Sequence, residues 1–296
     1  MSEKEYVLVT PARNEEANIG RLIQSVVSQT IRPKKWVVVS DGSVDRTDEI
    51  VSGYAKEHDF LQLHRAAEHA GQDFGSKAKA FRAGYDQLKG VEFGFVGNLD
   101  ADVSFGPDYF ERLLEKFEAN PGLGLAGGLI HERVGEKFEA QHLSPGSVAG
   151  AVQLFRRECF EAIGGYIPMR GGGIDAAAEI MSRMHGWTVQ TFTELPVQHH
   201  RRVFTGKGNM FSSRFQQGVT NYLLGYHPQF HLLSCLSRVW GRPYFLGSAM
   251  GILGYAWAWL RGDKRLVPNE VVSFLRAEQK ARMTVLFAGR KTVKQS

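Results

Sequence analysis

Short runs of β-branched and apolar residues alternate with helical stretches through the first 130 residues, and this alternation sets the narrowest limits on the fold. The apolar runs predict strands by their length and composition, at Tyr6–Thr10, Trp36–Ser40, Leu61–Leu63, Phe93–Leu99 and Leu123–Ala126. The stretches between them predict helices, at Ile19–Gln29, Asp45–Tyr54, Lys77–Leu88 and Pro107–Asn120. This pattern favours an α/β fold with a mostly parallel sheet and helices on both faces.

Polar clusters follow the first two predicted strands, where sheets of this kind bind their ligands. The first cluster is Thr10–Glu16, and the second is Ser40–Thr47, which includes Ser43. A carboxylate such as Glu15 or Asp41 could accept hydrogen bonds from a nucleotide base or ribose. The same residues are also typical of turns and helix caps, so both interpretations stay open.

The fourth predicted strand ends in two carboxylates, Asp100 and Asp102, separated by one residue. Alternate residues of an extended segment share a face, so both carboxylates can converge on one cation. Oxygen ligands of this kind suit Mg²⁺ or Mn²⁺, either of which would neutralise a diphosphate. A turn at the sheet edge is the alternative, but two carboxylates beside an apolar strand are costly without a partner. The sequence therefore predicts a divalent-cation site.

Several enzyme classes are disfavoured because their motifs are missing. No G-x-G-x-x-G follows the first strand, and the chain contains no P-loop or G-x-S-x-G motif. Two cysteines, Cys159 and Cys235, give no disulfide framework and fit a reducing compartment. The first apolar run is too short for the core of a signal peptide, which favours a cytoplasmic protein.

Together these segments resemble family 2 glycosyltransferases with the GT-A fold, of the bacterial or archaeal polysaccharide or glycolipid type. The resemblance covers residues 6–230. It rests on the order of five segments: Thr10–Glu16, Ser40–Thr47, Gly75-Ser76-Lys77 with Ala80 and Gly84, Asp100-Ala101-Asp102, and Gly172–Trp187.

The resemblance implies roles for particular residues. The nucleotide pocket would be lined by Pro11, Arg13, Glu15, Asp41 and Lys77, and we add Ser43 from the second polar cluster. Asp102 would be the main metal ligand, with Asp100 assisting towards the ribose or the metal. Asp175 would be the general base, although Ile174 replaces the Glu that usually precedes it. Glu179, one helical turn later, is the rival base.

A basic tetrapeptide, His199-His200-Arg201-Arg202, follows the predicted strand end at Leu195–Val197. In the resembled family, a His near this position often completes the metal site or contacts the diphosphate. A solvated basic loop is the alternative. Arg201 or Arg202 could also pair with phosphate oxygens.

The C-terminal third is basic and contains an uncharged aromatic stretch. Residues 199–296 contain 15 Lys and Arg against 3 Asp and Glu, whereas residues 1–198 contain 21 against 28. Pro243–Leu260 carries no charge. A helix of that length is about 27 Å long, slightly short of a ~30 Å hydrocarbon layer. A re-entrant or in-plane membrane helix and a buried core helix both fit. We divide the chain into a GT-A domain at 1–230 and a helical, basic, membrane-associating region at 231–296.

These observations predict a metal-dependent, inverting glycosyltransferase at the cytoplasmic face of the cell membrane. Its partners would be a nucleotide-diphosphate sugar as donor and a lipid-linked or glycan acceptor, with Mn²⁺ or Mg²⁺ as cofactor and no nucleic acid. A nucleotidyltransferase of related fold is the first alternative, although that class carries a Gly-rich loop after its first strand. A catalytically silent membrane-binding module is the second, and it would not require Asp100, Asp102 and Asp175.

Overall fold

The computed structural model describes residues 4–66, 75–134, 136–141, 146–169, 172–201, 210–238 and 244–292. The chain forms two compact units. The first unit comprises residues 1–170 and 174–203, and the second comprises residues 171–173 and 204–296.

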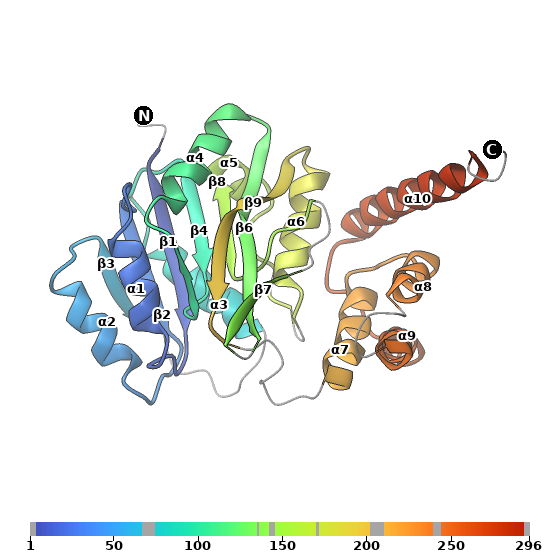
Figure 1. Ribbon diagram of the computed structural model, residues 1–296, viewed down its shortest axis with the longest axis horizontal. Helices are drawn as coiled ribbons and strands as arrows, with labels where there is room; N and C mark the ends of the chain where they lie inside the picture. Colours follow the sequence, from blue (N-terminus) through green and yellow to red (C-terminus); the bar gives the residue numbers. More distant parts are fainter. Residues whose placement is uncertain are drawn as a thin grey trace. The chain divides into compact units, whose positions relative to one another are not determined.

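A single sheet forms the centre of the first unit (Figure 1). Its strand order is β3-β2-β1-β4-β8-β6-β9-β5, and β7 pairs with β6. The strands are β1 (Tyr6–Ala12), β2 (Lys35–Ser40), β3 (Leu61–Arg65), β4 (Phe95–Leu99), β5 (Val103–Phe105), β6 (Leu123–Val134), β7 (Lys137–Ala140), β8 (Val152–Arg156) and β9 (Thr188–His199).

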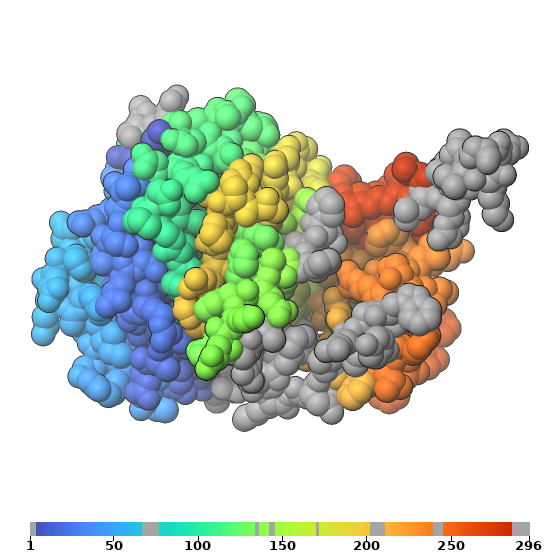
Figure 2. All heavy atoms as spheres, viewed as in Figure 1, coloured from blue at the N-terminus to red at the C-terminus, as the bar shows by residue number. Residues whose placement is uncertain are grey.

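The sheet confirms the α/β class and is parallel from β3 to β4, as the alternation predicts. Beyond β4 it is mixed, because β8 runs antiparallel to both β4 and β6, while β9 is parallel to β6. The β6–β7 hairpin reaches the surface, and in Figure 2 its bright green atoms adjoin the gold atoms of β9.

Helices cover both faces of the sheet, which follows from the alternating side chains of β1 and β2. The first unit contains α1 (Ile19–Val27), α2 (Thr47–Ala55), α3 (Gly75–Asp86), α4 (Tyr109–Ala119), α5 (Arg157–Ala162) and α6 (Ile174–Met184). On one face Tyr6 stacks on Phe110 of α4 at 4.5 Å between ring centroids. On the other face α3 packs closely through Gly84, where an added Cβ would lie 2.5 Å from Val9 Cγ1.

The helices and strands predicted for the first 130 residues are all present, with ends that differ by a few residues. The helix predicted from Asp45 begins at Thr47, whose N–H donates to Asp45 Oδ1 at 3.0 Å, so Asp45 belongs to the turn before the helix. The helix predicted from Pro107 begins at Tyr109. The sequence did not predict β5, β7, β8 or α5.

The second unit is helical in its described part: α7 (Met210–Leu223), α8 (Pro228–Ser237), α9 (Tyr244–Leu260) and α10 (Asn269–Thr292). Helices α7 and α9 pack with their backbones close together. A Cβ on Gly218 would overlap the carbonyl oxygen of Gly251, and a Cβ on Gly254 would overlap that of Phe215. This packing places α7 in the second compact unit, which begins near residue 204.

The uncharged stretch predicted from Pro243 forms α9, although Pro243 itself lies outside the described residues. Among the helices described, none combines the length and apolar character needed to cross a membrane.

Candidate functional site

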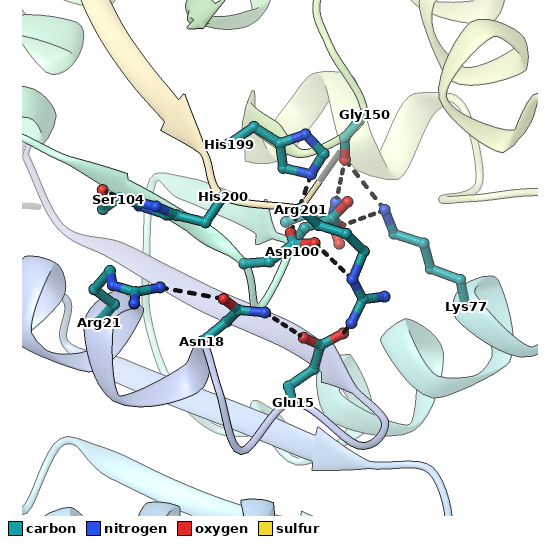
Figure 3. A network of polar contacts seen from close by, with 12 residues as sticks. Glu15, Asn18, Arg21, Lys77, Asp100, Ser104, Gly150, His199, His200 and Arg201 are labelled. Atoms are coloured by element: carbon teal, nitrogen blue, oxygen red, sulfur yellow. Dashed lines mark hydrogen bonds and ion pairs between the residues drawn. The ribbon is translucent and has the colours of Figure 1, made fainter. Parts of the chain in front are cut away.

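The polar residues singled out in the sequence gather where β4 and β9 end and where α3 and α6 begin. Asp100 and Asp102 directly follow β4, and β9 ends at His199. Lys77 lies in the first turn of α3, and Asp175 lies in the first turn of α6. Figure 3 shows the resulting network of polar contacts.

The two loops that follow β1 and β2 are joined by hydrogen bonds. Three consecutive backbone N–H groups of the first loop donate to side chains of the second: Asn14 to Ser43 Oγ at 3.2 Å, Glu15 to Thr47 Oγ1 at 2.7 Å, and Glu16 to Asp45 Oδ2 at 3.0 Å. Asn14 has a positive φ of 55°, a conformation that Asn adopts more readily than most residues. Ser43, Thr47 and Asp45 therefore fix the relative position of the two loops, which together form what we name the rim of the site.

Three other residues predicted to bind the nucleotide lie on the same rim. Pro11 is opposite Val39 in the β1–β2 register, and the N–H of Asp41 donates to the carbonyl of Ala12 at 3.0 Å. Arg13 Nε is buried and has no hydrogen-bond acceptor among the described residues. An unsatisfied buried donor is costly, so this guanidinium fits a ligand that brings an acceptor.

Lys77 and Asp100 form a close ion pair in the site. Lys77 Nζ lies 2.5 Å from Asp100 Oδ1 and 3.3 Å from the carbonyl oxygen of Gly150. Burial is the leading influence on both groups. Burial raises the pKa of Asp100, with the charge of Asp102 adding to it and Lys77 opposing it. Burial also acts to lower the pKa of Lys77, but the carboxylates of Asp100, Asp175 and Asp102 outweigh it and raise that pKa.

Asp102 faces two basic side chains. His199 Nε2 lies 3.2 Å from Asp102 Oδ1, and Arg201 Nε lies 3.6 Å from Oδ2. Burial favours the protonated carboxyl, yet His199 and Arg201 outweigh burial and lower the pKa of Asp102. At His199 burial acts to lower the pKa, but the neighbouring Asp102 carboxylate outweighs burial and raises the pKa overall.

Arg201 is itself held by Glu15 from the first rim loop. Arg201 Nη2 lies 2.5 Å from Glu15 Oε1, and Asn18 Nδ2 donates to Glu15 Oε2 at 3.2 Å. Glu15 is buried, and burial raises the pKa of its carboxyl. Glu15 therefore holds Arg201 (Figure 3), whose Nε lies 3.6 Å from Asp102 Oδ2. Arg202 lies outside the described residues.

The two adjacent histidines point to different partners. Whereas His199 faces Asp102, His200 Nε2 lies 2.7 Å from Ser104 Oγ. The backbone N–H of His200 donates to the carbonyl of Asp102 at 2.9 Å. This bond holds the end of β9 against residues 100–102, which we name the acidic loop. Burial lowers the pKa of His200, and Arg21 adds to that effect. The geometry thus favours His199 over His200 as a metal ligand.

The acidic loop fits a divalent cation in part. Asp102 Oδ1 is buried and accepts no hydrogen bond from the described residues, and His199 Nε2 is the nitrogen nearest to it. Carboxylate oxygen and imidazole nitrogen both bind Mn²⁺-type cations. In the described ranges, however, no three His, Cys, Asp or Glu side chains converge as a metal site. Asp102 and His199 are thus the candidate ligands among the described residues, and other oxygens would have to complete the coordination.

Asp175 lies against the same cluster. A Cβ added to Gly150 would lie 2.5 Å from Asp175 Oδ2, so the carboxylate rests directly on this glycine. The carbonyl of Gly150 accepts hydrogen bonds from Asn98 Nδ2 at 2.8 Å and from Lys77. Asp175, Gly150 and Lys77 therefore form one wall of the site.

Glu179 points away from this wall and is 7% exposed. Its Oε1 accepts hydrogen bonds from the N–H of Val148 at 2.8 Å and from Ser147 Oγ at 3.1 Å. Burial raises the pKa of Glu179 to about 8, with a smaller contribution from the charge of Asp175. Glu179 thus anchors the segment 146–150 that ends at Gly150, whereas Asp175 is the more accessible carboxylate of the two.

Sequence reasoning missed Asn98, Gly150 and Asn18. Asn98 was detectable in principle, because residues 98, 100 and 102 alternate on one face of the extended chain. No comparable local signal marks Gly150 or Asn18, since both act through residues distant in the sequence.

Comparisons with known proteins identify the family of this chain. The glycosyl transferase family 2 model matches residues 7–174, more than half of the chain. A β-monoglucosyldiacylglycerol synthase from Synechocystis is 28% identical over 193 residues, covering 63% of this chain and 38% of that protein. A poly-β-1,6-N-acetyl-D-glucosamine synthase from Staphylococcus epidermidis is 31% identical over 119 residues, covering 39% of this chain and 26% of that protein. The chain thus spans well under half the length of either relative.

The fold is also found among solved structures. A mannosyltransferase from Pyrobaculum calidifontis, solved with GDP-Man and Mn²⁺, superimposes with a TM-score of 0.55 at 18% identity. The match covers 99% of this chain and 81% of that one. The chain therefore belongs to glycosyl transferase family 2 and has the GT-A fold of glycosyltransferases.

Proposed function

We propose that this protein transfers a sugar from a nucleotide-diphosphate sugar to an acceptor hydroxyl with the help of a divalent cation. The observation that carries the proposal is the convergence of Lys77, Asp100, Asp102, Asp175 and His199 at the ends of β4 and β9. Family membership favours this activity over the nucleotidyltransferase and the silent membrane-binding module.

The donor would bind along the rim formed by the loops after β1 and β2. Arg13, with its unsatisfied Nε, would meet an acceptor group of the nucleotide, and Asp41 would accept from base or ribose. Pro11 and Ser43 shape this rim. Arg201, held by Glu15, lies beside Asp102 and would pair with diphosphate oxygens.

Asp102 and His199 would hold the cation, with Asp100 next to them. When bound, a Mn²⁺ or Mg²⁺ ion supplies charge neutralisation for the leaving diphosphate. The chain supports this role because the carboxylates of Asp100, Asp175 and Asp102 outweigh burial and raise the pKa of Lys77, so negative charge gathers here. The stabilised anionic form of Asp102 is the form that binds metal.

Asp175 would act as general base on the acceptor hydroxyl. It lies in the first turn of α6 and rests on Gly150, and its charge acts on the nearby Lys77. The position of the acceptor hydroxyl beside this carboxylate must supply much of the rate enhancement. Inversion of configuration is an expectation from the family resemblance.

The acceptor would be lipid-linked or a glycan, presented at the cytoplasmic face of the cell membrane. The names of the two relatives, a glycolipid synthase and a polysaccharide synthase, support both acceptor classes. Polysaccharide or glycolipid biosynthesis is the corresponding process.

A thermal-shift panel tests the proposal. UDP, GDP and their sugars are each added with Mn²⁺, with Mg²⁺ or with a chelator. Binding to the folded state alone raises stability by about 2.7 kcal/mol at a ligand concentration of 100 Kd. One nucleotide diphosphate should raise the Tm in the presence of cation and much less with chelator. If no nucleotide diphosphate raises the Tm under any condition, the proposed donor class is wrong.

A further inference from the structure

Helix α9 has two apolar faces of different character and no charged residue. Four small residues at helical spacing form one buried face: Gly247, Gly251, Gly254 and Ala258. The opposite face consists of large apolar residues at the same spacing: Leu246, Leu253, Trp257 and Leu260, with Trp259 on its flank. We name these five residues the outer face of α9.

The small face of α9 accounts for its packing within the unit. Gly218 of α7 lies against Gly251, and Gly254 lies against the backbone of Phe215. On the side of α8, Ser248 Oγ donates to the carbonyl of Cys235 at 2.7 Å. The small side chains therefore let α9 pack closely against α7 and α8.

The large side chains of α9 point outward, and each residue of the outer face is between 52% and 73% exposed. Single exposed apolar residues are common on soluble proteins, but a continuous stripe of leucines and tryptophans marks an interaction surface. A water-facing helix would normally place its large apolar residues inward and its polar residues outward. Helix α9 does the reverse, so its outer face requires a partner.

We propose that the outer face of α9 docks into the interfacial layer of an anionic phospholipid bilayer, with the helix axis in the membrane plane. The helix has 17 residues, or about 26 Å, which is short for a span but suits an in-plane helix. Trp257 and Trp259 are residues that favour the headgroup level.

Charge favours lipid over a second copy of the chain. Residues 199–296 contain 15 Lys and Arg against 3 Asp and Glu. Arg238 at the end of α8 and Arg261 and Lys264 after α9 are exposed at the helix ends. Self-association through this unit would bring like charges together, whereas an anionic headgroup layer attracts each exposed basic residue.

This docking is independent of the sugar-transfer chemistry, because every residue it uses lies outside the candidate active site. It deepens the proposed function by stating which surface would bring the enzyme to a membrane-borne acceptor. An Asp175→Asn variant should therefore bind vesicles as the unmodified protein does, even if it transfers no sugar.

The test compares two leucine- or valine-to-glutamate changes of equal charge and exposure. Leu260 on the outer face is 73% exposed, and Val285 on α10 is 72% exposed, so neither change disturbs a core. The full chain is floated with phosphatidylcholine vesicles with and without phosphatidylglycerol. Leu260→Glu should lower the partition coefficient on anionic vesicles by about tenfold, and Val285→Glu by less than about twofold. A Leu253→Glu/Trp257→Glu variant should abolish binding.

Tryptophan fluorescence supplies a second measurement, of how deeply α9 inserts into the bilayer. Bromine-labelled acyl chains should quench part of the emission of the five tryptophans, and a Trp257→Phe/Trp259→Phe variant should lose that quenching. Equal partitioning of Leu260→Glu and Val285→Glu would overturn the proposal. A second outcome would also overturn it. In that outcome the unmodified protein does not bind vesicles, sediments as a dimer, and becomes a monomer when Leu260→Glu is introduced.

Discussion

Buried Glu179 should make the stability of this protein depend on pH in a direction opposite to most carboxylates. Burial raises its pKa to about 8 in the folded state, from 4.5 as the ordinary value. Its Oε1 accepts the N–H of Val148 at 2.8 Å, and Arg183 Nη1 lies 3.9 Å from Oε2, but burial outweighs both of these influences on the ionised form. The neutral carboxyl is thus the form that the fold favours.

The sign follows from proton linkage. Between about pH 4.5 and pH 8 the native state binds more protons at Glu179 than the unfolded state, so stability falls as pH rises. The contribution is fully present below the unfolded pKa and is lost as pH rises through the folded pKa. At about 1.4 kcal/mol for each tenfold difference in proton affinity, the full effect is at most about 4 to 5 kcal/mol.

Glu179→Gln keeps the carbonyl acceptor for Val148 and removes the titration. Denaturant unfolding from about pH 5 to pH 9 should show the stability of the unmodified protein falling relative to that of Glu179→Gln by a few kcal/mol. Exposed Glu158→Gln is the matched control and should leave the pH dependence unchanged. Parallel curves for the unmodified protein and Glu179→Gln would refute the reasoning.

Three further substitutions probe the metal site, the acidic wall and the helical unit. Asp102→Ala should abolish cation-dependent donor binding in titration calorimetry, and unchanged Mn²⁺ dependence would show that the metal is bound elsewhere. Gly150→Ala should displace the Asp175 carboxylate, which lies 2.5 Å from the added Cβ, and lower turnover about tenfold or more with donor affinity retained. Gly218→Ala should destabilise the protein by about 1–3 kcal/mol in denaturant unfolding because α7 and α9 touch there, whereas Gly53→Ala, with open space around it, should not.

The sequence predicts the first half of the fold well because its signals are local. Periodicity and caps locate β1 to β4 and α1 to α4 within a few residues. The part of the sheet beyond β4 is harder to predict from the sequence. Strand β5 has only three residues, and β8 runs antiparallel between β4 and β6, a pairing that depends on contacts distant in the chain. The division near residue 203 likewise depends on the contact of α7 with α9.

The candidate site shows the same contrast. The spacing of Asp100 and Asp102 predicts that both carboxylates share a location, and the structure places them beside Lys77 and His199. Ser43 was predicted to bind the nucleotide, and the structure additionally shows its oxygen accepting the N–H of Asn14. No sequence pattern distinguishes such a loop-to-loop bond from a ligand contact, because both use the same side chain at the same strand end.

The carboxylates of α6 illustrate a further limit. Asp175 and Glu179 are four residues apart and share a helical face, so periodicity alone cannot rank them as bases. Burial distinguishes them, because Glu179 is buried and accepts a hydrogen bond from the N–H of Val148, whereas Asp175 lies against Gly150 at the edge of the site.

Turnover and donor affinity measured together in Asp175→Asn and Glu179→Gln test the proposed chemistry most directly. Asp175→Asn preserves size and hydrogen bonding but removes the proton acceptor. Its turnover should fall by roughly 10²–10⁴, with donor affinity within a few-fold of the unmodified protein. Glu179→Gln should reduce turnover much less. The account is contradicted if Glu179→Gln abolishes turnover while Asp175→Asn leaves it largely intact.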